Sequence, residues 1–281
     1  MNLKKLITLL IILGVLTGCE ANETNLNELP KEQSQAESVS PLLLESLSKS
    51  LNKQKQDIKM EDLFNIEELT LDIDNVPLEQ RDAPIDLSVL SKMKNLKTLS
   101  LNRINVKDYL FLKDLSELEY LSIAGFQEAQ LPVLNNSKLI SLSLNEGDLS
   151  DLKMLENSKS LQHLTIRNNK ITALSSIKLP HLTFLDVSNN PINSMNFVKE
   201  LPNLERLQMM NAPITDITSI QSVTKLNYLD IRGTKVTSIK PLLSLDELSI
   251  LLVDRKSISD LALLKKEIKV AENGNEINDG N

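Results

Sequence analysis

Residues 161–190 read LQHLTIRNNKITALSSIKLPHLTFLDVSNN, and the pattern in this stretch decides the fold. In it a leucine is followed by apolar residues three and five positions later, first at Leu161 and again at Leu182. The same pattern recurs on both sides of this stretch at a nearly constant step. The leucines that open the eight units are Leu96, Leu118, Leu139, Leu161, Leu182, Leu204, Leu226 and Leu248. Self-similarity at a fixed period of this size predicts a stack of structural repeats.

Each unit predicts one short strand followed by a return segment. Counting the opening leucine as position 0, side chains at positions 3 and 5 point to one face of a strand, and those at positions 2, 4 and 6 point to the other. One unit cannot bury its apolar face alone, so stacked units are expected to share a leucine core under a parallel sheet. The short return leaves room for 3₁₀ turns or extended segments rather than full helices. The carboxylates expected to cap these turns are Asp108, Asp151, Asp216 and Asp260.

An earlier unit opens at Ile66, further from Leu96 than the usual step between units. Because this step is longer than the others, we expect a loop of about eight extra residues around Val76–Pro84. The sequence therefore predicts a solenoid of about nine units over residues 66–270. Whether the extra loop makes a functional contact stays open.

A solenoid exposes its core at both ends and needs caps. Residues 41–65 are expected to form a helical N-terminal cap, with Ser40 as the N-cap residue before Pro41. The leucines that would form its buried stripe are Leu43, Leu47 and Leu51. Residues 261–270 are expected to close the other end, and the polar residues 271–281 to form a disordered tail.

The repeated LxxLxL units resemble the leucine-rich-repeat family, and its 22-residue internalin-like type in particular. The resemblance implies an α/β solenoid, a horseshoe with a parallel sheet on its concave side and short 3₁₀ or extended segments on its convex side. The family usually carries asparagine at position 8, where its amide bonds to neighbouring backbone. Only Asn169 and Asn190 match this, so we expect a partial asparagine ladder and some irregularity between units. The residues at position 8 of the other units are Ile104, Phe126, Gly147, Ala212, Thr234 and Lys256.

The start of the chain has the organisation of an export signal. Lys4 and Lys5 precede the apolar run Leu6–Leu16, which has the length of a signal-peptide core and is too short to span a bilayer. The following motif, Leu16-Thr17-Gly18-Cys19, resembles the lipobox of bacterial lipoproteins. The resemblance implies a signal peptide over residues 1–18 and a lipid on Cys19, and several acyl chains would hold the protein stably on a membrane. A plain signal peptide, or a buried cysteine, stays open as the alternative.

Residues 19–40 are polar and acidic and are expected to form a disordered tether behind the lipidated cysteine. The lipobox resemblance places the protein in a bacterial cell envelope, lipid-anchored and facing the periplasm or the exterior. In Gram-negative lipoproteins an Asp after the cysteine tends to mean retention in the inner membrane. Glu20 stands there instead, which favours the outer membrane if the organism has one.

The composition excludes several classes of protein. Leucine supplies 55 of the 281 residues, whereas the chain has one Cys and two His, too few for a disulfide scaffold or a Cys/His zinc site. With 31 basic and 38 acidic residues the formal charge is −7. Removal of residues 1–18 would leave 29 basic residues against 38 acidic ones, a charge of −9, which disfavours nucleic acid as a partner. No phosphate-binding loop or hydrolase motif is present, so we expect neither an enzyme nor a cofactor or metal site.

The informative surface is the outward face of the strands, at positions 2, 4 and 6 of each unit. Three of the eight aromatic residues stand at position 2, and exposed aromatics beside arginines are typical of protein-binding hot spots. The alternative is that these side chains are packing pairs between neighbouring strands. The candidate binding residues are Tyr120, His163, Arg167, Phe184, Asp186, Arg206, Met210, Tyr228, Asp230, Arg232 and Ile250, with most weight on the second half of the stack.

The leading hypothesis is a membrane-anchored, non-enzymatic module that binds an unidentified protein of the envelope or of a host, and that is itself monomeric. Recognition of a glycan or cell-wall polymer is an alternative, because aromatic side chains would stack on sugars at the same positions. An accessory or inhibitor subunit of an envelope enzyme is a third possibility.

Overall fold

The computed structural model describes most of the chain after residue 39. The described residues are 40–76, 78, 81–126, 131–174, 178–265 and 267–271. All of them belong to one compact unit, Ser38–Asn281. The predicted signal peptide, Cys19, the tether up to residue 39 and the tail beyond Ala271 lie outside the described residues.

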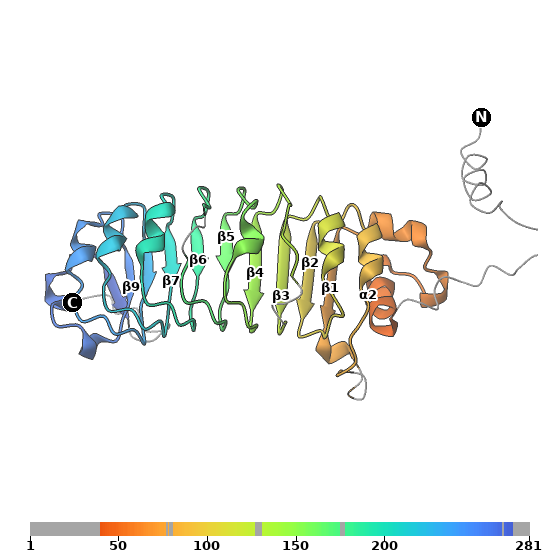
Figure 1. The fold of residues 1–281 in the computed structure, drawn as a ribbon, viewed down its shortest axis with the longest axis horizontal. Coiled ribbons are helices and arrows are strands. Elements are labelled where there is room, and N and C mark those ends of the chain that lie inside the picture. The colour runs from red at the N-terminus through yellow and green to blue at the C-terminus, as the bar shows by residue number, and fades with distance from the viewer. Residues whose placement is uncertain are drawn as a thin grey trace, which may run out of the picture. The chain divides into compact units, whose positions relative to one another are not determined.

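The N-terminal end of the solenoid is covered by helix α2 (Pro41–Leu51). It begins where the backbone N–H of Leu43 donates to the Ser40 hydroxyl at 3.2 Å, and it ends at Asn52, whose φ is 51°. The helix contacts β1 (Glu68–Asp72), the first strand of the sheet (Figure 1). Two 3₁₀ turns, Lys55–Asp57 and Met60–Asn65, complete this end, so only its first part is α-helical.

The strands form one parallel sheet in which each strand pairs with the next in sequence (Figure 1). The register joins equivalent positions of neighbouring units, for example Leu142 with Leu164 and Leu164 with Leu185. After β1 come β2 (Thr98–Asn102), β3 (Tyr120–Ala124), β4 (Ser141–Asn145), β5 (His163–Thr165), β6 (Phe184–Asp186), β7 (Arg206–Gln208), β8 (Tyr228–Asp230), β9 (Ile250–Leu252) and β10 (Lys269–Ala271). The predicted solenoid and its register are confirmed.

Short 3₁₀ turns follow most strands, as the short return predicts. Asp108, Asp151 and Asp216 stand one residue before the N-cap position, and each accepts the N–H of the first residue of its turn at 2.8–3.0 Å. The hydroxyl and N–H of Thr218 lower the pKa of Asp216. The turns are η5 (Ile73–Asn75), η7 (Ser88–Lys92), η8 (Leu110–Asp114), η10 (Lys153–Leu155), η11 (Asn196–Glu200), η12 (Thr218–Ser222), η13 (Lys240–Ser244), η14 (Arg255–Ser257) and η15 (Leu261–Leu263).

Asp260 stands at the N-cap position of η15, as expected, but its side chain does not cap that turn. Its carboxylate accepts the backbone N–H of Ile239 at 2.8 Å and the Ser238 hydroxyl at 2.5 Å, both in the preceding unit. This carboxylate therefore ties one unit to the next, because in a stack the preceding return segment lies as close as the residue's own turn.

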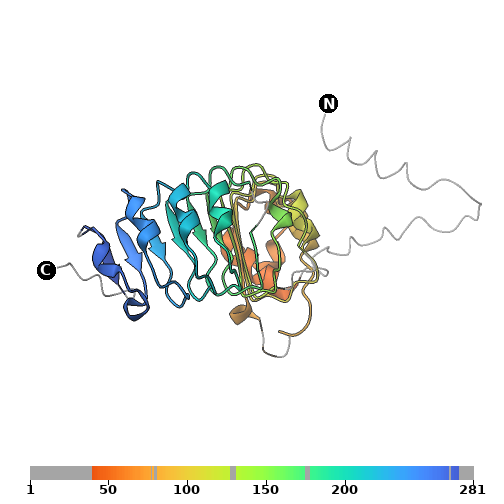
Figure 2. The same ribbon diagram turned by 60° about the vertical axis from the view of Figure 1, so that its left-hand side comes forward.

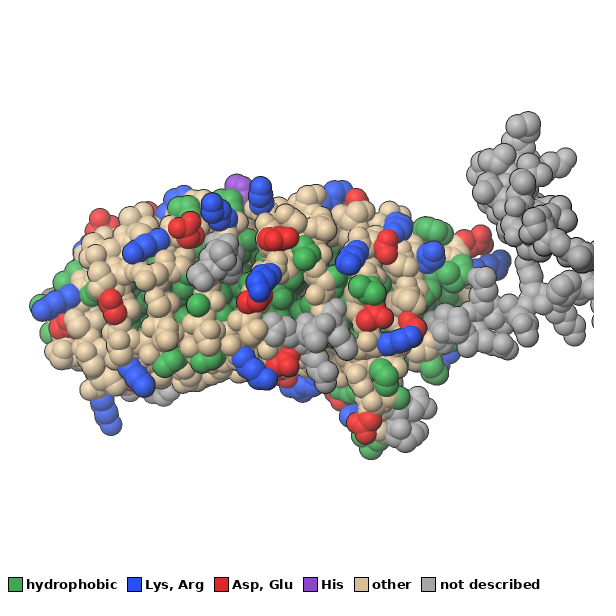
Figure 3. Space-filling model, in the orientation of Figure 1, with side chains coloured by type: hydrophobic (Ala, Val, Ile, Leu, Met, Phe, Trp, Pro, Cys, Tyr) green, Lys and Arg blue, Asp and Glu red, His purple; other side chains and the backbone are tan. Residues whose placement is uncertain are grey.

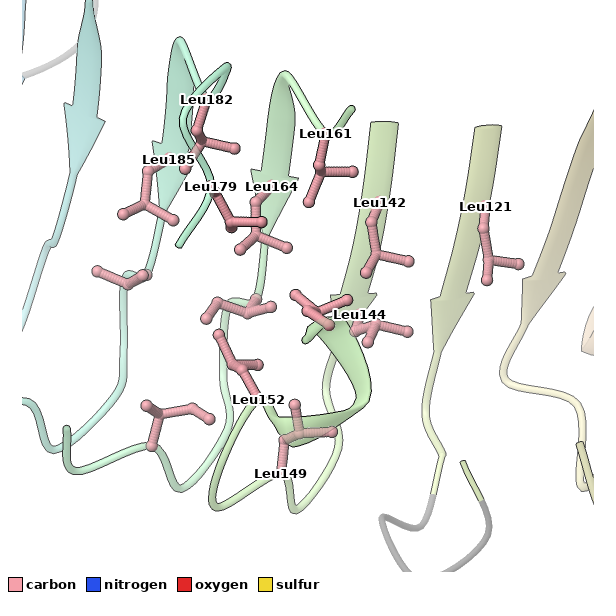
Figure 4. Close-up of a cluster of buried hydrophobic side chains, with 14 of the residues drawn as sticks. Leu121, Leu142, Leu144, Leu149, Leu152, Leu161, Leu164, Leu179, Leu182 and Leu185 are labelled. Carbon is pink, nitrogen blue, oxygen red and sulfur yellow. The ribbon is translucent and has the colours of Figure 1, made fainter. Parts of the chain in front are cut away.

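The core is a continuous column of leucines between the sheet and the return segments (Figure 4). Leu164 and Leu185, at position 3 of their units, are each 1% exposed. Figure 4 shows them beside Leu161 and Leu182, which open the same units, with Leu149 and Leu152 contributed by a return segment. Figure 2 shows that the stack bends along its length, because its C-terminal units appear side-on and its N-terminal units end-on.

The C-terminal end differs from the sequence prediction, and the extra loop is joined to the stack. A tenth strand, β10, follows the nine predicted units and includes Ala271, which was expected to begin the tail. The sequence does not reveal this strand because Lys269 pairs with Ile250 after a step shorter than the others, and no opening leucine marks the unit. In the extra loop before β2, Ile85 returns to the stack through a parallel bridge to Val106.

Candidate functional site

The strand face is the side of the sheet that points away from the leucine core. In β2 the leucines at positions 3 and 5 are buried, whereas Thr98, Ser100 and Asn102 between them are partly exposed. We call the outward residues of β1–β4 and the two residues after each strand the N-terminal strand face. Those of β5–β10 form the C-terminal strand face, where most of the candidate binding residues lie.

Position 2 of the C-terminal strand face forms a row of neighbouring side chains. The sheet register places His163, Phe184, Arg206 and Tyr228 side by side in consecutive strands. The rings of His163 and Phe184 meet edge-on, with centroids 6.2 Å apart. The Arg206 guanidinium lies 4.5 Å from the centre of the Tyr228 ring, in cation–π geometry. The row therefore consists of packing pairs that still present partly exposed side chains to solvent.

The sequence predicts that Asp186 and Asp230, at position 4, are exposed on this face. In the structure both are buried. Each is only 2% exposed. Asp186 accepts the backbone N–H of Ser188 at 2.9 Å, and Asp230 accepts that of Arg232 at 3.2 Å. Strands β6 and β8 end at these aspartates, so the N–H two residues later is bonded by the carboxylate instead of the sheet. The two aspartates support the face from below, and their carboxylates are not open to a partner.

The same carboxylates hold arginines on the surface. Arg232 donates from Nε to Asp230 Oδ1 at 2.9 Å and from Nη2 to Oδ2 at 2.6 Å, a bidentate pair. This hydrogen bonding to Asp230 raises the pKa of Arg232. The Nη2 of Arg232 also lies 3.3 Å from the Met210 sulfur. Arg167 is held more loosely, with Nε 3.4 Å from Asp186 Oδ2.

Gln208 belongs to this cluster although the sequence did not single it out. It stands at position 4 between Asp186 and Asp230, in the strand that pairs with the strand of Tyr228. Burial raises the pKa of Tyr228, and the charge of Asp230 adds to this. The signal that could have found Gln208 is its place in the same column as the two aspartates.

The structure brings together ten of the eleven candidate residues, from His163 in β5 to Ile250 in β9. The exception is Tyr120 in β3, whose neighbours in the register are Thr98 and Ser141. Its side chain is 45% exposed and stands apart from the aromatic and arginine row.

A column of left-handed residues at position 7 borders the strand face, and the sequence reasoning missed it. Its members are Arg103, Gly125, Glu146, Asn168, Asn189, Asn211 and Gly233, with φ between 53° and 70°. Asparagine and glycine tolerate this conformation, and their recurrence at one position is the signal. At Gly125 a Cβ would lie 3.0 Å from the Arg103 side chain, which passes over the glycine to Glu146 with an Nη2–Oε2 distance of 2.7 Å.

The partial asparagine ladder at position 8 is confirmed. Asn190 donates from Nδ2 to the carbonyl oxygen of Ile166 at 2.7 Å and accepts the N–H of Ile171 at 3.0 Å. Asn169 makes the equivalent bonds to Leu144 and Leu149, at 2.8 and 3.2 Å. Two consecutive units are therefore joined through buried side-chain amides.

The part of the chain that the structure describes contains no group of three or more His, Cys, Asp or Glu side chains placed to hold a metal ion. Within the same residues, no helix combines the length and the apolar character needed to cross a membrane.

Comparisons with known proteins agree with this architecture. Residues 180–222 match the family described as Leucine Rich repeats (2 copies). Among curated proteins, the 187-kDa microtubule-associated protein AIR9 of Arabidopsis thaliana is 36% identical over 91 residues. That match covers 31% of this chain and 5% of the length of the relative.

Solved structures give a longer match. Internalin C2 of Listeria monocytogenes superposes with a TM-score of 0.65 at 22% identity, over 76% of this chain and 93% of that one. InlP of the same organism gives a TM-score of 0.59 at 19% identity, over 76% of this chain and 64% of that one. A leucine-rich-repeat protein of Leptospira interrogans gives 0.55 at 22% identity, over 67% and 48%. At these identities the likeness is one of fold, and the chain is a leucine-rich-repeat solenoid.

Proposed function

We propose that this chain is an exported, lipid-anchored binding module that holds another protein on its C-terminal strand face and performs no chemistry itself. The observation that carries the proposal is the row from His163 to Tyr228, in which aromatic and arginine side chains are already held by their neighbours. Side chains held in advance lose little conformational freedom on binding, which favours affinity. A leucine-rich-repeat fold fits such binding of a protein partner.

The anchor is the second part of the proposal. Its support is the lipobox-like motif ending at Cys19, the one cysteine of the chain. A lipid on Cys19 would place the solenoid at a membrane of a bacterial cell envelope, behind a tether of about twenty residues. Replacement of Cys19 by Ala should abolish incorporation of labelled palmitate and release the protein from the membrane fraction. Unchanged labelling would contradict the anchor and leave the binding face untouched.

The binding face is tested by capture from an envelope lysate. Residues 20–281 contain the whole compact unit Ser38–Asn281 and serve as the bait. The test variant carries Phe184→Ala, Arg206→Ala and Tyr228→Ala, and a matched control carries Thr98→Ala, Ser100→Ala and Ser122→Ala on the N-terminal strand face. Thermal melts must first show that both variants fold.

A protein that the wild type and the control retain, and that the test variant loses, supports the proposal. Equal retention by all three baits overturns it. The rings of His163, Phe184 and Tyr228 could also stack on sugars, so the same three baits are offered to purified envelope glycan. Saturable binding there, with no protein retained, would replace the proposal with glycan recognition.

A further inference from the structure

The C-terminal strand face reverses the charge of the molecule. The whole chain has 31 basic and 38 acidic residues. Among the described residues of this face, the cations are Arg167, Arg206, Arg232 and Lys269, and the carboxylates are Asp186, Asp230 and Asp254. A local excess of positive charge on an acidic protein attracts an anionic partner.

Burial places the cations of this face nearer to a partner than two of its three carboxylates. Asp186 and Asp230 are each 2% exposed and already bonded to backbone N–H groups, so a partner meets their arginines and not their carboxylates. Of the three acids, only Asp254 is exposed, and its carboxylate accepts the N–H of Gly233 at 2.7 Å.

Arg206 lies at the centre of this face and differs from Arg81, Arg103, Arg167 and Arg232, each of which lies beside a carboxylate. Among the described residues, no carboxylate lies within ion-pair distance of its guanidinium, which instead packs over the ring of Tyr228. Stacking uses the face of a guanidinium, whereas its five N–H donors lie in its plane and match a carboxylate bidentately. The ring therefore positions Arg206 and leaves its capacity for a carboxylate unused.

Several lysines of the stack also lie beside carboxylates of neighbouring units. Lys97 Nζ lies 2.7 Å from Glu67 Oε2, and Lys94 Nζ lies 3.3 Å from Asp114 Oδ1. Figure 3 shows basic and acidic side chains mixed in the same way over the face in view. An arginine without such a neighbour, on the face already proposed to bind, points to an acid that the partner supplies.

We propose that the partner presents an acidic peptide segment to the C-terminal strand face, with one of its carboxylates bound by Arg206. This inference rests on the proposed function and specifies the chemistry of the partner. Two flanking cations, Arg232 after β8 and Lys269 in β10, extend the attraction to further acids of the same segment. Phe184 and Tyr228 supply apolar contact beside Arg206.

The test measures fluorescence anisotropy of a labelled peptide with six Glu residues separated by Gly and Ser, against the same peptide with Gln in place of Glu. The protein is residues 20–281, at low and at physiological salt. We expect the Glu peptide to bind at least about tenfold more tightly than the Gln peptide, with weaker binding as salt rises. Arg206→Gln should lower the affinity for the Glu peptide about five- to tenfold, and Arg206→Lys should lower it less.

The matched control is Lys113→Gln, which removes the same charge from an exposed site in η8 on the opposite side of the core. An equal loss for Lys113→Gln and Arg206→Gln would reduce the effect to overall charge and overturn the inference. Equal binding of the two peptides would overturn it as well. The inference would also be overturned if the protein bound inorganic polyphosphate but not the Glu peptide, because the face would then be a phosphate site.

Failure of this inference can be told apart from failure of the proposed function. One outcome is that the triple alanine variant loses a captured protein, while neither salt nor Arg206→Gln weakens the binding of that protein to the solenoid. This outcome would support the proposed function and contradict the acidic segment. The converse outcome is that the Glu peptide binds in a way that depends on Arg206, while no bait captures a protein. This outcome would support the preference for acidic ligands and contradict the protein partner.

Discussion

The two halves of the strand face are built on the same core but carry different surfaces. In β2 and β4 the outward residues are small and polar: Thr98, Ser100 and Asn102, then Ser141, Ser143 and Asn145. From β5 onward the outward residues include aromatics, arginines and buried aspartates. The leucines beneath are equally buried in both halves. Because strand side chains alternate between the two faces, the surface can change without disturbing the core.

The halves also differ in strand length, and the side chains explain this difference. Strands β1–β4 have five residues each, whereas β5–β10 have three. In the second half the N–H at position 6 is taken by side chains, such as Asn145 Oδ1 for Arg167 at 2.8 Å and the Ser188 hydroxyl for Met210 at 3.2 Å. A backbone donor bonded to a side chain is no longer available to the ladder, so the regular strand stops earlier.

The largest effect on stability should come from disrupting the leucine core, which the two halves share. Leu185→Asp would bury an unpaired charge in the middle of the stack, and Leu142→Asp would do the same in the first half. Each should cost more than about 4 kcal/mol and abolish the cooperative thermal transition, followed by circular dichroism. Leu185→Met conserves volume and should melt almost normally. A normal melt of either aspartate variant would refute the register.

A smaller loss of stability is expected when the asparagine ladder is broken. The second half has this ladder and the first half does not. Asn190→Ala would leave the N–H of Ile171 and the carbonyl of Ile166 buried without their partner. Urea denaturation should show a loss of about 2–4 kcal/mol. The partly exposed Asn203, whose Nδ2 donates to the carbonyl of Pro180, provides the control, and Asn203→Ala should cost less than about 1 kcal/mol. Equal losses would mean that the buried amide bonds add nothing.

In the first half, position 8 is filled by packing instead of hydrogen bonds. A Cβ on Gly147 would lie 2.6 Å from Cζ of Phe126, so the phenyl ring occupies the space of the missing side chain. Gly147→Ala should therefore destabilise the fold by about 1–3 kcal/mol in chemical denaturation. In a Phe126→Leu background the cost of the same change should shrink. A double-mutant cycle with purely additive effects would show that the two residues do not compete.

The smallest effect concerns the pH dependence of stability that comes from Tyr228 in the second half. Burial raises the pKa of Tyr228, so the folded chain keeps this proton at a pH where the unfolded chain has begun to lose it. The stability linked to this group is therefore full below the ordinary value of about 10 and is lost as pH rises through the folded value. Tyr228→Phe should reduce the fall in Tm between pH 9 and pH 11, by at most about 2–4 °C. Burial raises the pKa of Tyr109 to about 12 in both proteins, so its contribution cancels in the comparison. Identical pH profiles for the two proteins would contradict the shift.

Much of the candidate site followed from the repeat alone. The nearly constant step between units brings equivalent positions of neighbouring units side by side, so the row of His163, Phe184, Arg206 and Tyr228 could be read from the sequence. The alternative to binding, that such residues form lateral packing pairs, describes Arg206 with Tyr228 and His163 with Phe184. Their part in binding stays a prediction.

What the sequence by itself determined is the periodic part of the structure: the leucine core, the strand register, the short 3₁₀ turns and the face that each side chain takes. These follow from local spacing, because the backbone alternates faces at every residue. Only the tertiary structure decided where each strand stops, and with it the burial of Asp186 and Asp230 and the support of Arg167 and Arg232. The reason is that a strand ends where its backbone donors find side-chain acceptors, and those acceptors come from the neighbouring unit as readily as from the same one.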